Sequence, residues 1–454
     1  MLRKLVPFIA ASFVSSLVLS GCATVAPSPQ QDPVLVVDSS GELEPERRAK
    51  FLENMTKWST TGVVEAMLDD IAALSRTPLY MDNHVELLID GPETYERMTD
   101  AIESAEQYVL LETYIFADDE VGMMFADLLT KRSREGVAVK VIYDSFGSAG
   151  ADDSFFAEMK SAGVEVREFN TLNPLKGETP LDFNRRNHRK ILVVDGKVAF
   201  TGGINLSSTY STSSSLPVIG DPETSGWRDT HIAVRGPAVS GFQQQFIEYW
   251  AAMGGNTPAQ VRTPGEFDRE GAEAVAIISA RGGDDIQSEI FEAYLHAMSV
   301  AEERIWITQA YFVPNKRFMS ELQSAAQRGV DVRVLVPGVS DSDIVLHASR
   351  SRYGQLLKAG VTVYERQDAL LHAKTAVMDG IWSTVGSSNL DSRSFIHNDE
   401  INAVILGHQF AKEMESQFLR DLDHSREMSL SHWQNRSIWT RLKEKFAWLV
   451  EYWI

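Results

Sequence analysis

The chain has 454 residues, of which 44% are hydrophobic and 23% are charged, and its formal net charge is −20. This length gives room for two ordinary domains or one large duplicated domain, and the composition is typical of a soluble globular protein with a buried core. The acidic charge argues against a nucleic-acid partner, because nucleic acid and anionic lipid headgroups repel such a body. The single cysteine excludes an intramolecular disulfide.

The N-terminus predicts a cleaved export signal over residues 1–21. Arg3 and Lys4 precede an apolar run, residues 5–19, that is too short and wrongly flanked for a membrane-spanning helix. The run leads into Leu-Ser-Gly and then Cys22, which resembles the cleavage box of bacterial lipoproteins. This resemblance implies that Cys22 is acylated and becomes the mature N-terminus. An ordinary signal peptide with an incidental cysteine is the alternative.

Export and acylation would place the protein in the cell envelope. Cleavage removes two of the 43 basic residues and none of the 63 acidic ones, which takes the net charge from −20 to about −22. Membrane attachment would then come from acyl chains and not from charge. Ala23 follows the cysteine, where many lipoproteins of the inner membrane have aspartate. We therefore expect a lipid-anchored protein of the outer membrane that faces the periplasm.

The region after the cysteine predicts a tether and then an α/β body. Residues 22–77 are expected to form a flexible tether, rich in Pro, Ser and Gln up to about residue 45, and an N-terminal helical region. From residue 78 onward, apolar strand-like runs such as 137–142 alternate with helical stretches such as 122–134. This alternation indicates an α/β layer fold.

The body consists of two similar halves, residues 78–258 and 259–425. Residues 135–141 read EGVAVKV and correspond to RGVDVRV further along the chain, and a second pair of matching segments follows each of them. The first half carries two extra stretches of 13 residues, near 170–186 and within 207–225. We expect both at the mouth of the site, where loops set specificity. Tolerated surface loops are the alternative.

The C-terminal segment, residues 426–454, predicts an amphipathic helix. Trp439, Leu442 and Phe446 recur at helical spacing, together with apolar residues up to Trp453. Such a helix either docks on the body or lies in a membrane interface, and the sequence leaves both open.

One polar signature occurs twice at identical internal spacing, which indicates one active site built from two halves. The copies are His188-x-Lys190-x4-Asp195 with Gly202-Gly203-x-Asn205, and His372-x-Lys374-x4-Asp379 with Gly386-Ser387-x-Asn389. In each copy the histidine and the lysine are two residues apart in a predicted strand, so their side chains point the same way. A tight Asp-Gly hairpin turn is expected after each strand.

These residue types fit phosphoryl transfer. A neutral imidazole is a nucleophile and a charged one is a proton donor, so a pair of histidines can divide the two roles near neutral pH. Two lysines and two asparagine amides would stabilise the negative charge on the non-bridging phosphoryl oxygens. No other histidine recurs at ligand spacing and no further cysteine exists, so we expect neither a metal nor a cofactor.

Both motifs, with the flanking segments 113–116, 227–229, 310–314 and 386–395, resemble the phospholipase D superfamily and are similar to its bacterial cardiolipin synthases. The resemblance covers about residues 80–425. It implies two tandem α/β/α halves related by pseudo-twofold symmetry, with one shared active site at their interface. It also implies a two-step transfer through a covalent phosphohistidine, without a metal.

The resemblance further implies a role for each residue. Family precedent makes His188 the nucleophile, although the sequence alone does not choose between it and His372. Asp195 and Asp379 would have a structural or orienting role. Asp229 and Glu400 match acidic residues that hydrogen-bond the histidines. The expected catalytic set is His188, Lys190, Asp195, Asn205, Asp229, His372, Lys374, Asp379, Asn389 and Glu400.

The function expected from this resemblance is phosphatidyl transfer between phospholipids, which makes cardiolipin and free glycerol from phosphatidylglycerol. A phospholipase D that transfers the group to water and releases phosphatidic acid is the alternative, and it would use the same residues. The acidic charge opposes a nuclease, and the two intact motifs oppose a catalytically silent scaffold. A lipid anchor in place of the paired N-terminal membrane helices of common cardiolipin synthases leaves the donor and acceptor open.

Overall fold

The computed structural model describes residues 36–38, 41–74, 78–171, 184–214, 226–256, 270–283 and 288–450. The expected export signal and Cys22 lie outside these residues, as does much of the two insertions expected near the site. All described residues belong to a single compact unit, residues 33–454.

The first half is built on a mixed sheet. Its strands are β3 (Leu79–Ile89), β4 (Tyr108–Thr113), β5 (Ala138–Asp144), β6 (Glu165–Phe169), β8 (Ile191–Val194), β9 (Val198–Gly202) and β10 (Thr230–Arg235). They lie in the order β3, β10, β9, β8, β4, β5, β6. Only the β4–β5 and β5–β6 pairs are parallel.

The second half repeats this sheet strand for strand. Its strands are β11 (Glu273–Ala280), β12 (Arg304–Gln309), β13 (Asp331–Pro337), β14 (Thr362–Arg366), β15 (Lys374–Met378), β16 (Trp382–Gly386) and β17 (Asn398–Leu406). Their order is β11, β17, β16, β15, β12, β13, β14, and β18 (Ser425–Glu427) extends it. The edge strands β3 and β11 pair with each other, so the two sheets are joined.

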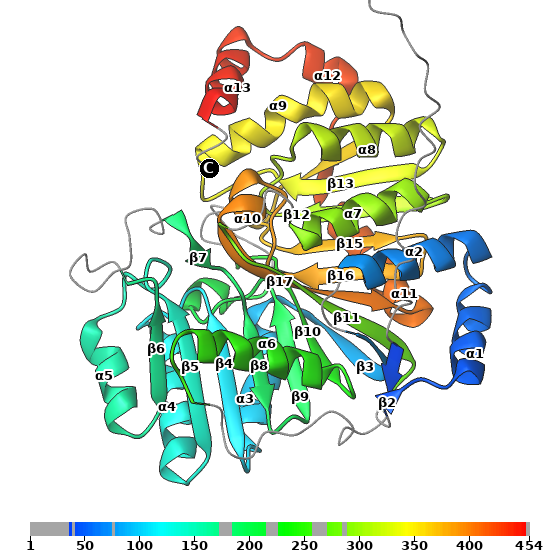
Figure 1. The fold of residues 1–454 in the computed structure, drawn as a ribbon. Helices are drawn as coiled ribbons and strands as arrows, with labels where there is room; N and C mark the ends of the chain where they lie inside the picture. The colour runs from blue at the N-terminus through cyan, green and yellow to red at the C-terminus, as the bar shows by residue number, and fades with distance from the viewer. Residues whose placement is uncertain are drawn as a thin grey trace, which may run out of the picture. The chain divides into compact units, whose positions relative to one another are not determined.

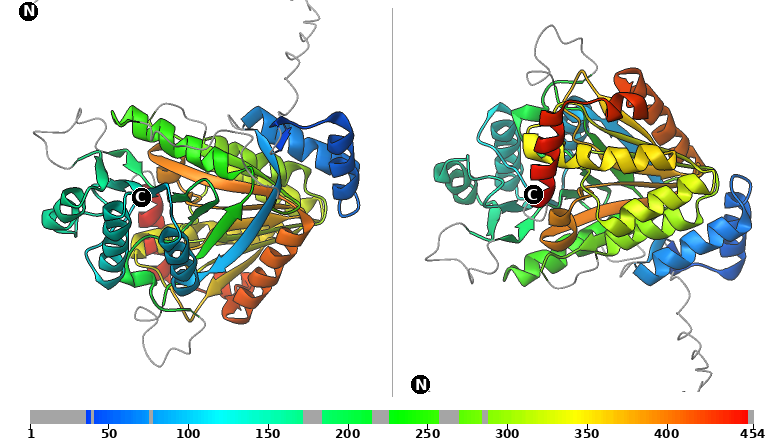
Figure 2. Two further views of the ribbon diagram at one scale, coloured as in Figure 1. Left: turned by 90° about the horizontal axis from the view of Figure 1, so that it is seen from below. Right: turned by 90° about the horizontal axis from the view of Figure 1, so that it is seen from above.

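Helices cover both sheets (Figure 1). The first half has α3 (Asp90–Glu103), α4 (Glu120–Arg134), α5 (Asp153–Ser161) and α6 (Val239–Ala252), and the second has α7 (Glu289–Val300), α8 (Lys316–Gln327), α9 (Asp343–Ala359) and α11 (His408–Asp423). Figure 2 shows α3 to α5, in cyan and teal, in front when seen from below, and α8 and α9, in yellow-green and yellow, in front when seen from above. The predicted architecture of two tandem α/β halves is confirmed.

Three apolar cores hold these layers together. One lies between the first sheet and α3 to α5, and one lies between the second sheet and α7 to α9. A third core contains α6, α11 and strands of both sheets. Because helices cover both faces, β4 and β8 are buried along their whole length, which explains their continuous apolar sequence.

Shorter elements complete the described chain. They are β1 (Val36–Asp38), β2 (Gly41–Glu42), α1 (Pro45–Met55), α2 (Thr61–Leu74), β7 (Arg186–Asn187), η2 (Ser208–Tyr210), α10 (Ser392–Ile396), α12 (Leu430–Gln434) and α13 (Ile438–Val450). The tether expected up to about residue 45 is too long by these bounds, because β1 already pairs with β2 and β3. Among the helices formed by the described residues, none is both long and apolar enough to cross a membrane.

Candidate active site

Backbone pairing between the halves brings the two histidine segments to the centre of the molecule. In β7, residues 186–187 pair with Asn398 and Asp399 of β17, and the amide of His188 donates to the carbonyl of Asp399 at 2.9 Å. In the same way, the amide of His372 donates to the carbonyl of Arg228 at 2.8 Å. Each histidine is therefore fixed to the backbone of the residue that precedes the acidic residue of the other half, Asp399 before Glu400 and Arg228 before Asp229.

The histidine side chains also contact acidic residues of the opposite half. Nδ1 of His188 lies 3.0 Å from Oε2 of Glu400, and Nδ1 of His372 lies 2.7 Å from Oδ2 of Asp229. All four side chains are buried. A carboxylate on Nδ1 fixes the tautomer and leaves Nε2 of each ring for a substrate.

The two carboxylates have different surroundings. Glu400 accepts hydrogen bonds from the hydroxyls of Ser387, at 2.5 Å, and Ser394, at 2.8 Å. Asp229 accepts from the amide of Thr230 at 2.7 Å, and its Oδ1 lies only 2.2 Å from the place that a Cβ on Gly203 would take. The position of Ser387 in the second half is thus occupied by Gly203 in the first.

The two carboxyl groups also differ in the direction of their pKa shifts. Burial raises the pKa of Glu400 above its ordinary value, and the nearby Lys190 and serine hydroxyls only partly oppose this. Burial acts likewise on Asp229, but its contacts with His372 and Lys374 outweigh burial and lower its pKa. Asp229 is therefore the more firmly anionic partner.

The motif lysines lie beside the histidines. Nζ of Lys190 donates to the carbonyl of His188 at 2.6 Å, and Nζ of Lys374 donates to that of His372. An ammonium has three donors, so each lysine keeps protons for an incoming anion. Burial lowers the pKa of both lysines, to about 8 for Lys374. Burial and the adjacent lysines also lower the pKa of both imidazoles.

The two asparagines of the motif differ in their partners. Nδ2 of Asn205 donates to the hydroxyl of Tyr210 at 2.9 Å, and that hydroxyl lies 3.5 Å from Nδ1 of His372. The buried Oδ1 of Asn389 has no hydrogen-bond partner in the described part of the chain. Their equal positions in the repeat therefore do not give them equal contacts.

The structure does not bring Asp195 and Asp379 to the histidines. Each lies in the hairpin turn at the other end of its strand, with φ near +50°, as the predicted Asp-Gly turn requires. Asp195 accepts three successive backbone amides, those of residues 106–108, at 2.7 to 2.8 Å. Asp379 accepts those of residues 302–304 at 2.8 to 2.9 Å. These contacts give both residues the structural role that the resemblance implied and take them out of the expected catalytic set, because they fix the starts of β4 and β12.

Aromatic side chains that the sequence reasoning did not assign line the histidines. The ring of Tyr114 lies edge-on to His188 at 5.0 Å, and the ring of Trp227 lies 5.1 Å from His372. The backbone pairing after β4 and β12 places Ala310, not Tyr311, at the position of Tyr114 in the second half. Tyr114 and Trp227 both lie in segments that carry the family resemblance, which was the signal available in the sequence.

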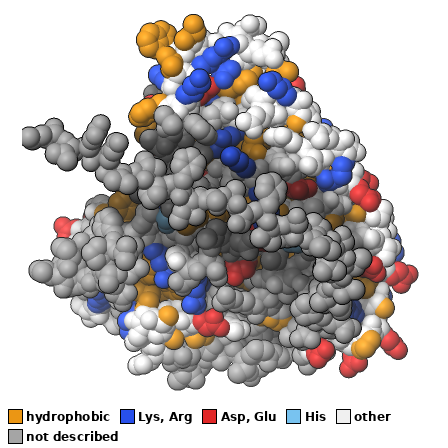
Figure 3. All heavy atoms as spheres, turned by 45° about the horizontal axis from the view of Figure 1, so that its top comes forward, with side chains coloured by type: hydrophobic (Ala, Val, Ile, Leu, Met, Phe, Trp, Pro, Cys, Tyr) orange, Lys and Arg blue, Asp and Glu red, His pale blue; other side chains and the backbone are white. Residues whose placement is uncertain are grey.

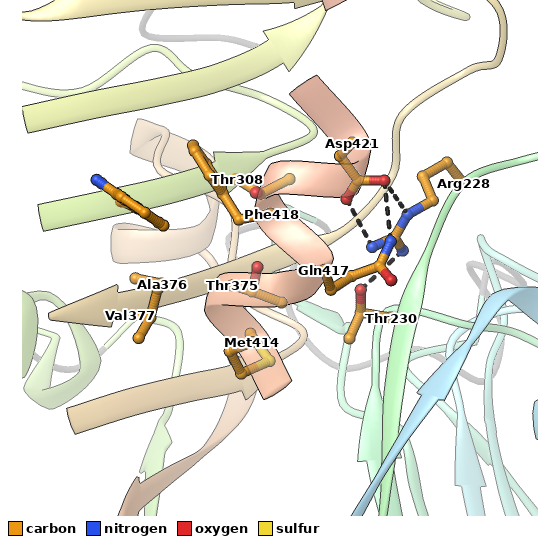
Figure 4. A pocket seen from close by; sticks show the side chains of 11 residues that line it. Arg228, Thr230, Thr308, Thr375, Ala376, Val377, Met414, Gln417, Phe418 and Asp421 are labelled. Carbon is orange, nitrogen blue, oxygen red and sulfur yellow. Dashed lines mark hydrogen bonds and ion pairs between the residues drawn. The ribbon is translucent and has the colours of Figure 1, made fainter. Parts of the chain in front are cut away.

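An ion-pair network holds the segment before Asp229. The guanidinium of Arg228 forms two bonds with the carboxylate of Asp421 on α11, at 2.8 and 2.9 Å, and Arg366 donates to the same carboxylate at 2.6 Å. Figure 4 shows Arg228 directed at Asp421, with Thr230 beside it. Arg228 thus ties the first half to a helix of the second half next to the His372–Asp229 pair.

Among the described residues, no group of three or more His, Cys, Asp or Glu side chains is placed to hold a metal ion. The groups that could act on a substrate are the two imidazoles, the two ammonium groups and the asparagine amides. This set offers a nucleophile, a proton donor and cationic hydrogen-bond donors for an anion.

Comparisons with known proteins agree with this site. Residues 98–219 and 294–422 match the family model described as "Cardiolipin synthase, PLD-like domain". The chain is 36% identical over 382 residues to the cardiolipin synthase of Halalkalibacterium halodurans, covering 83% of this chain and 73% of that protein. It is 35% identical over 363 residues to cardiolipin synthase A of Pseudomonas aeruginosa, covering 80% and 71%.

A solved structure has a similar fold. The phosphatidylserine synthase of Haemophilus influenzae matches with a TM-score of 0.63 over 87% of this chain and 100% of that one, at 14% sequence identity. At this identity the match concerns the fold alone. It agrees with the two-half architecture described above.

Proposed function

This chain belongs to the family of cardiolipin synthases with phospholipase D-like domains, and we propose that it transfers a phosphatidyl group from one phosphatidylglycerol to another. The enzyme is a phosphatidyltransferase of the phospholipase D type. The observation that carries the proposal is the pair of buried His–carboxylate contacts, each formed across the two halves. They present two Nε2 atoms, one able to attack phosphorus and one able to move a proton.

In the first step, Nε2 of His188 attacks the phosphorus of the donor lipid, and the bond from phosphorus to the glycerol headgroup oxygen breaks. His372 gives its proton to that oxygen, so glycerol leaves and a phosphohistidine forms. Two differences support this division of roles. The firmly anionic Asp229 stabilises an imidazolium at His372, whereas Glu400 is less firmly anionic, because burial raises its pKa, and stabilises an imidazolium at His188 less.

In the second step, His372 takes the proton from the headgroup hydroxyl of a second phosphatidylglycerol. That oxygen attacks phosphorus, the phosphorus–nitrogen bond breaks, and cardiolipin leaves. Lys190, Lys374 and the motif asparagines stabilise the charge on the non-bridging oxygens in both steps. Exchange of one phosphodiester for another needs no activated nucleotide, which suits an exported enzyme.

The test uses protein without residues 1–22 and vesicles that contain phosphatidylglycerol, with lipid products identified by mass spectrometry. Residues 33–454 form the compact unit, so this deletion removes none of it. Cardiolipin and glycerol in equal amounts from wild type, and neither from His188→Ala or His372→Ala, are expected. Phosphatidic acid without cardiolipin would show that water is the acceptor and that the protein is a phospholipase D.

We also propose that acylated Cys22 anchors the enzyme to the outer membrane on its periplasmic side. The support is the sequence Leu-Ser-Gly-Cys after an apolar run, followed by Ala23, where many inner-membrane lipoproteins have aspartate. Cys22→Ser should abolish the acylated N-terminus in mass spectra of the purified protein and should prevent cleavage before residue 22. An unmodified cysteine at the mature N-terminus would overturn the anchor.

A further inference from the structure

The C-terminal helix α13 carries an exposed apolar stripe. Ile438, Trp439, Leu442 and Phe446 are between 50% and 77% exposed. At 3.6 residues per turn, these four positions fall within an arc of about 100°. Large apolar side chains gathered in this way mark a surface that meets an apolar partner.

The opposite side of α13 is docked on the body. Ala447 is buried against Val345 and Ala348 of α9 and against Val313. Glu444 is also buried, in an ion pair of 2.7 Å with Arg436. The helix is therefore held in place by one side only, and docking on the body does not account for the stripe. Docking on the body and lying in a membrane interface, the two alternatives left open by the sequence, are therefore compatible.

Basic side chains flank the stripe. Arg441 and Lys445 lie on one side of the apolar arc of the helix and Lys443 on the other, and all three are exposed. Figure 3 shows apolar and basic side chains next to each other over the top of the molecule. In a chain of net charge −20, a basic border around an apolar stripe is complementary to an anionic lipid surface.

The helix lies beside the active site. Ala447 shares its cluster with Tyr311, which lies in the segment after β12. The ring of Tyr114, in the segment after β4, contacts His188. Tyr311 is close enough to Tyr114 and Asp391 for both to affect its pKa. Two further exposed apolar residues follow the parallel strands at this edge of the sheets, Phe146 after β5 and Ile344 after β13.

We propose that α13 docks this edge of the enzyme on an anionic phospholipid bilayer, with the apolar stripe in the lipid and the basic residues at the headgroups. The inference rests on the proposed function, because a phosphatidyl donor keeps its acyl chains in the membrane while its phosphate enters the site. Docking through α13 is separate from the anchor at Cys22. It sets the orientation of the site, which attachment at Cys22 alone does not.

Binding is measured first, by co-sedimentation of protein without residues 1–22 with vesicles. Vesicles of phosphatidylglycerol and phosphatidylcholine are compared with vesicles of phosphatidylcholine alone. Wild type should bind the anionic vesicles more tightly, and added salt should weaken this binding. Trp439→Ser with Phe446→Ser should weaken it at least about tenfold.

Matched controls separate position from composition. Leu442→Ser should weaken binding, whereas Leu419→Ser should not, although Leu419 on α11 is exposed to 45% against 50% for Leu442. Lys443→Gln with Lys445→Gln should remove the preference for anionic vesicles. Lysine-to-glutamine substitutions at two exposed lysines on other helices, Lys358 and Lys412, should leave this preference unchanged.

Activity is read separately, on monomeric short-chain phosphatidylglycerol and on vesicles. The stripe variants should keep wild-type turnover of the monomeric lipid and lose turnover on vesicles. If wild type turns over neither lipid but binds vesicles through the stripe, the proposed function fails and the docking stands. Vesicle binding by the Trp439 and Phe446 double variant equal to wild type would overturn the docking. So would a lipid-free dimer that this variant disrupts, because a second copy would then cover the stripe.

Discussion

His188 contacts Glu400 through Nδ1 at 3.0 Å, although 212 residues separate them in the chain. The other motif histidine contacts Asp229, 143 residues earlier, at 2.7 Å. Each histidine therefore depends on the half to which it does not belong. A site of this kind exists only when both halves are folded against each other, so the chemistry and the assembly of the two halves are linked.

Removing the charge of the two carboxylates should change stability in opposite directions. The folded-state pKa of Glu400 is raised, so the folded protein loses stability through this group as pH rises above its ordinary value of 4.5. The folded-state pKa of Asp229 is lowered, so this group stabilises the protein above its ordinary value of 3.8, and that stability is lost as pH falls through the folded-state pKa. At pH 8 we expect Glu400→Gln to unfold at or above the wild-type temperature and Asp229→Asn to unfold below it.

The measurement is thermal unfolding at one scan rate, at pH 5 and pH 8. The gain from Glu400→Gln should be smaller at pH 5, where the wild-type carboxyl is largely protonated. Equal destabilisation by both variants at pH 8 would contradict the asymmetry between the two pairs. Both variants should lose activity, because each removes the anion that orients its histidine.

Activity should decline on the alkaline side of neutrality. Burial lowers the pKa of both histidines below 6.5, so the nucleophile stays neutral into mildly acidic solution. Burial also lowers the pKa of Lys190 and brings that of Lys374 to about 8, so positive charge is lost as pH rises. We expect kcat/KM for monomeric short-chain phosphatidylglycerol to fall between pH 7 and pH 9.

Arginine tests the origin of this alkaline decline. Arginine at position 374 keeps its proton over the whole pH range. The decline in kcat/KM of Lys374→Arg should therefore move to higher pH, even if its maximal kcat/KM is lower. A decline that is unchanged in this variant would assign the loss to another group. A flat wild-type profile from pH 7 to pH 9 would contradict the lowered lysine pKa values.

Asp379 should matter for stability and not for the chemical step. Asp379→Ala leaves three backbone amides without their acceptor and places alanine at φ near +49°. A loss of about 2–4 kcal/mol in the free energy of unfolding follows. Asp379→Asn keeps one acceptor oxygen and tolerates this φ, so it should lose less. The folded variants should keep kcat within about threefold of wild type, whereas a loss comparable to that of His372→Ala would return Asp379 to the catalytic set.

Gly203 should be needed for the His372–Asp229 contact. A Cβ at this position would lie 2.2 Å from Oδ1 of Asp229, so Gly203→Ala must displace the carboxylate. A shift of about 1 Å in a catalytic group can cost about a hundredfold in rate, and we expect a loss of this size in kcat with little change in KM. Gly62→Ala on α2 is the matched control, because a Cβ there meets no atom within 4 Å. Wild-type kcat in Gly203→Ala would show that the contact is dispensable.

Much of the fold could be predicted because it is local. The alternation of apolar runs and helical stretches indicated the α/β layers, and the repeat of segments such as 135–141 indicated two halves with one strand order. The Asp-Gly turns were predicted from residue type alone and have the positive φ values that such turns need. The described N-terminal strand β1 was missed, since three residues beside prolines and serines carry no periodic signal.

Within the site, sequence reasoning found the residues but not their pairing. Which carboxylate meets which histidine depends on the contact between Asp399 and His188, which no local pattern encodes. The structural role expected for Asp195 is borne out, and its distance from the histidine could also have been inferred. Seven residues of strand, at about 3.3 Å each, place it roughly 20 Å from His188. The role of α13 needed the structure, because only packing shows which side of the helix stays exposed.

The join between β3 and β11 has a consequence for how such a site can arise. Two identical half-chains meeting in this way would form an isologous dimer, in which symmetry gives both histidines the same partner. Duplication within a single gene lifts that restriction, since each copy then changes alone. Aspartate beside glycine in one copy and glutamate beside serine in the other are divergences that a homodimer cannot have. Tandem fusion thus lets two histidines of common descent take different roles, which in the proposed mechanism are those of the nucleophile and of the acid and base.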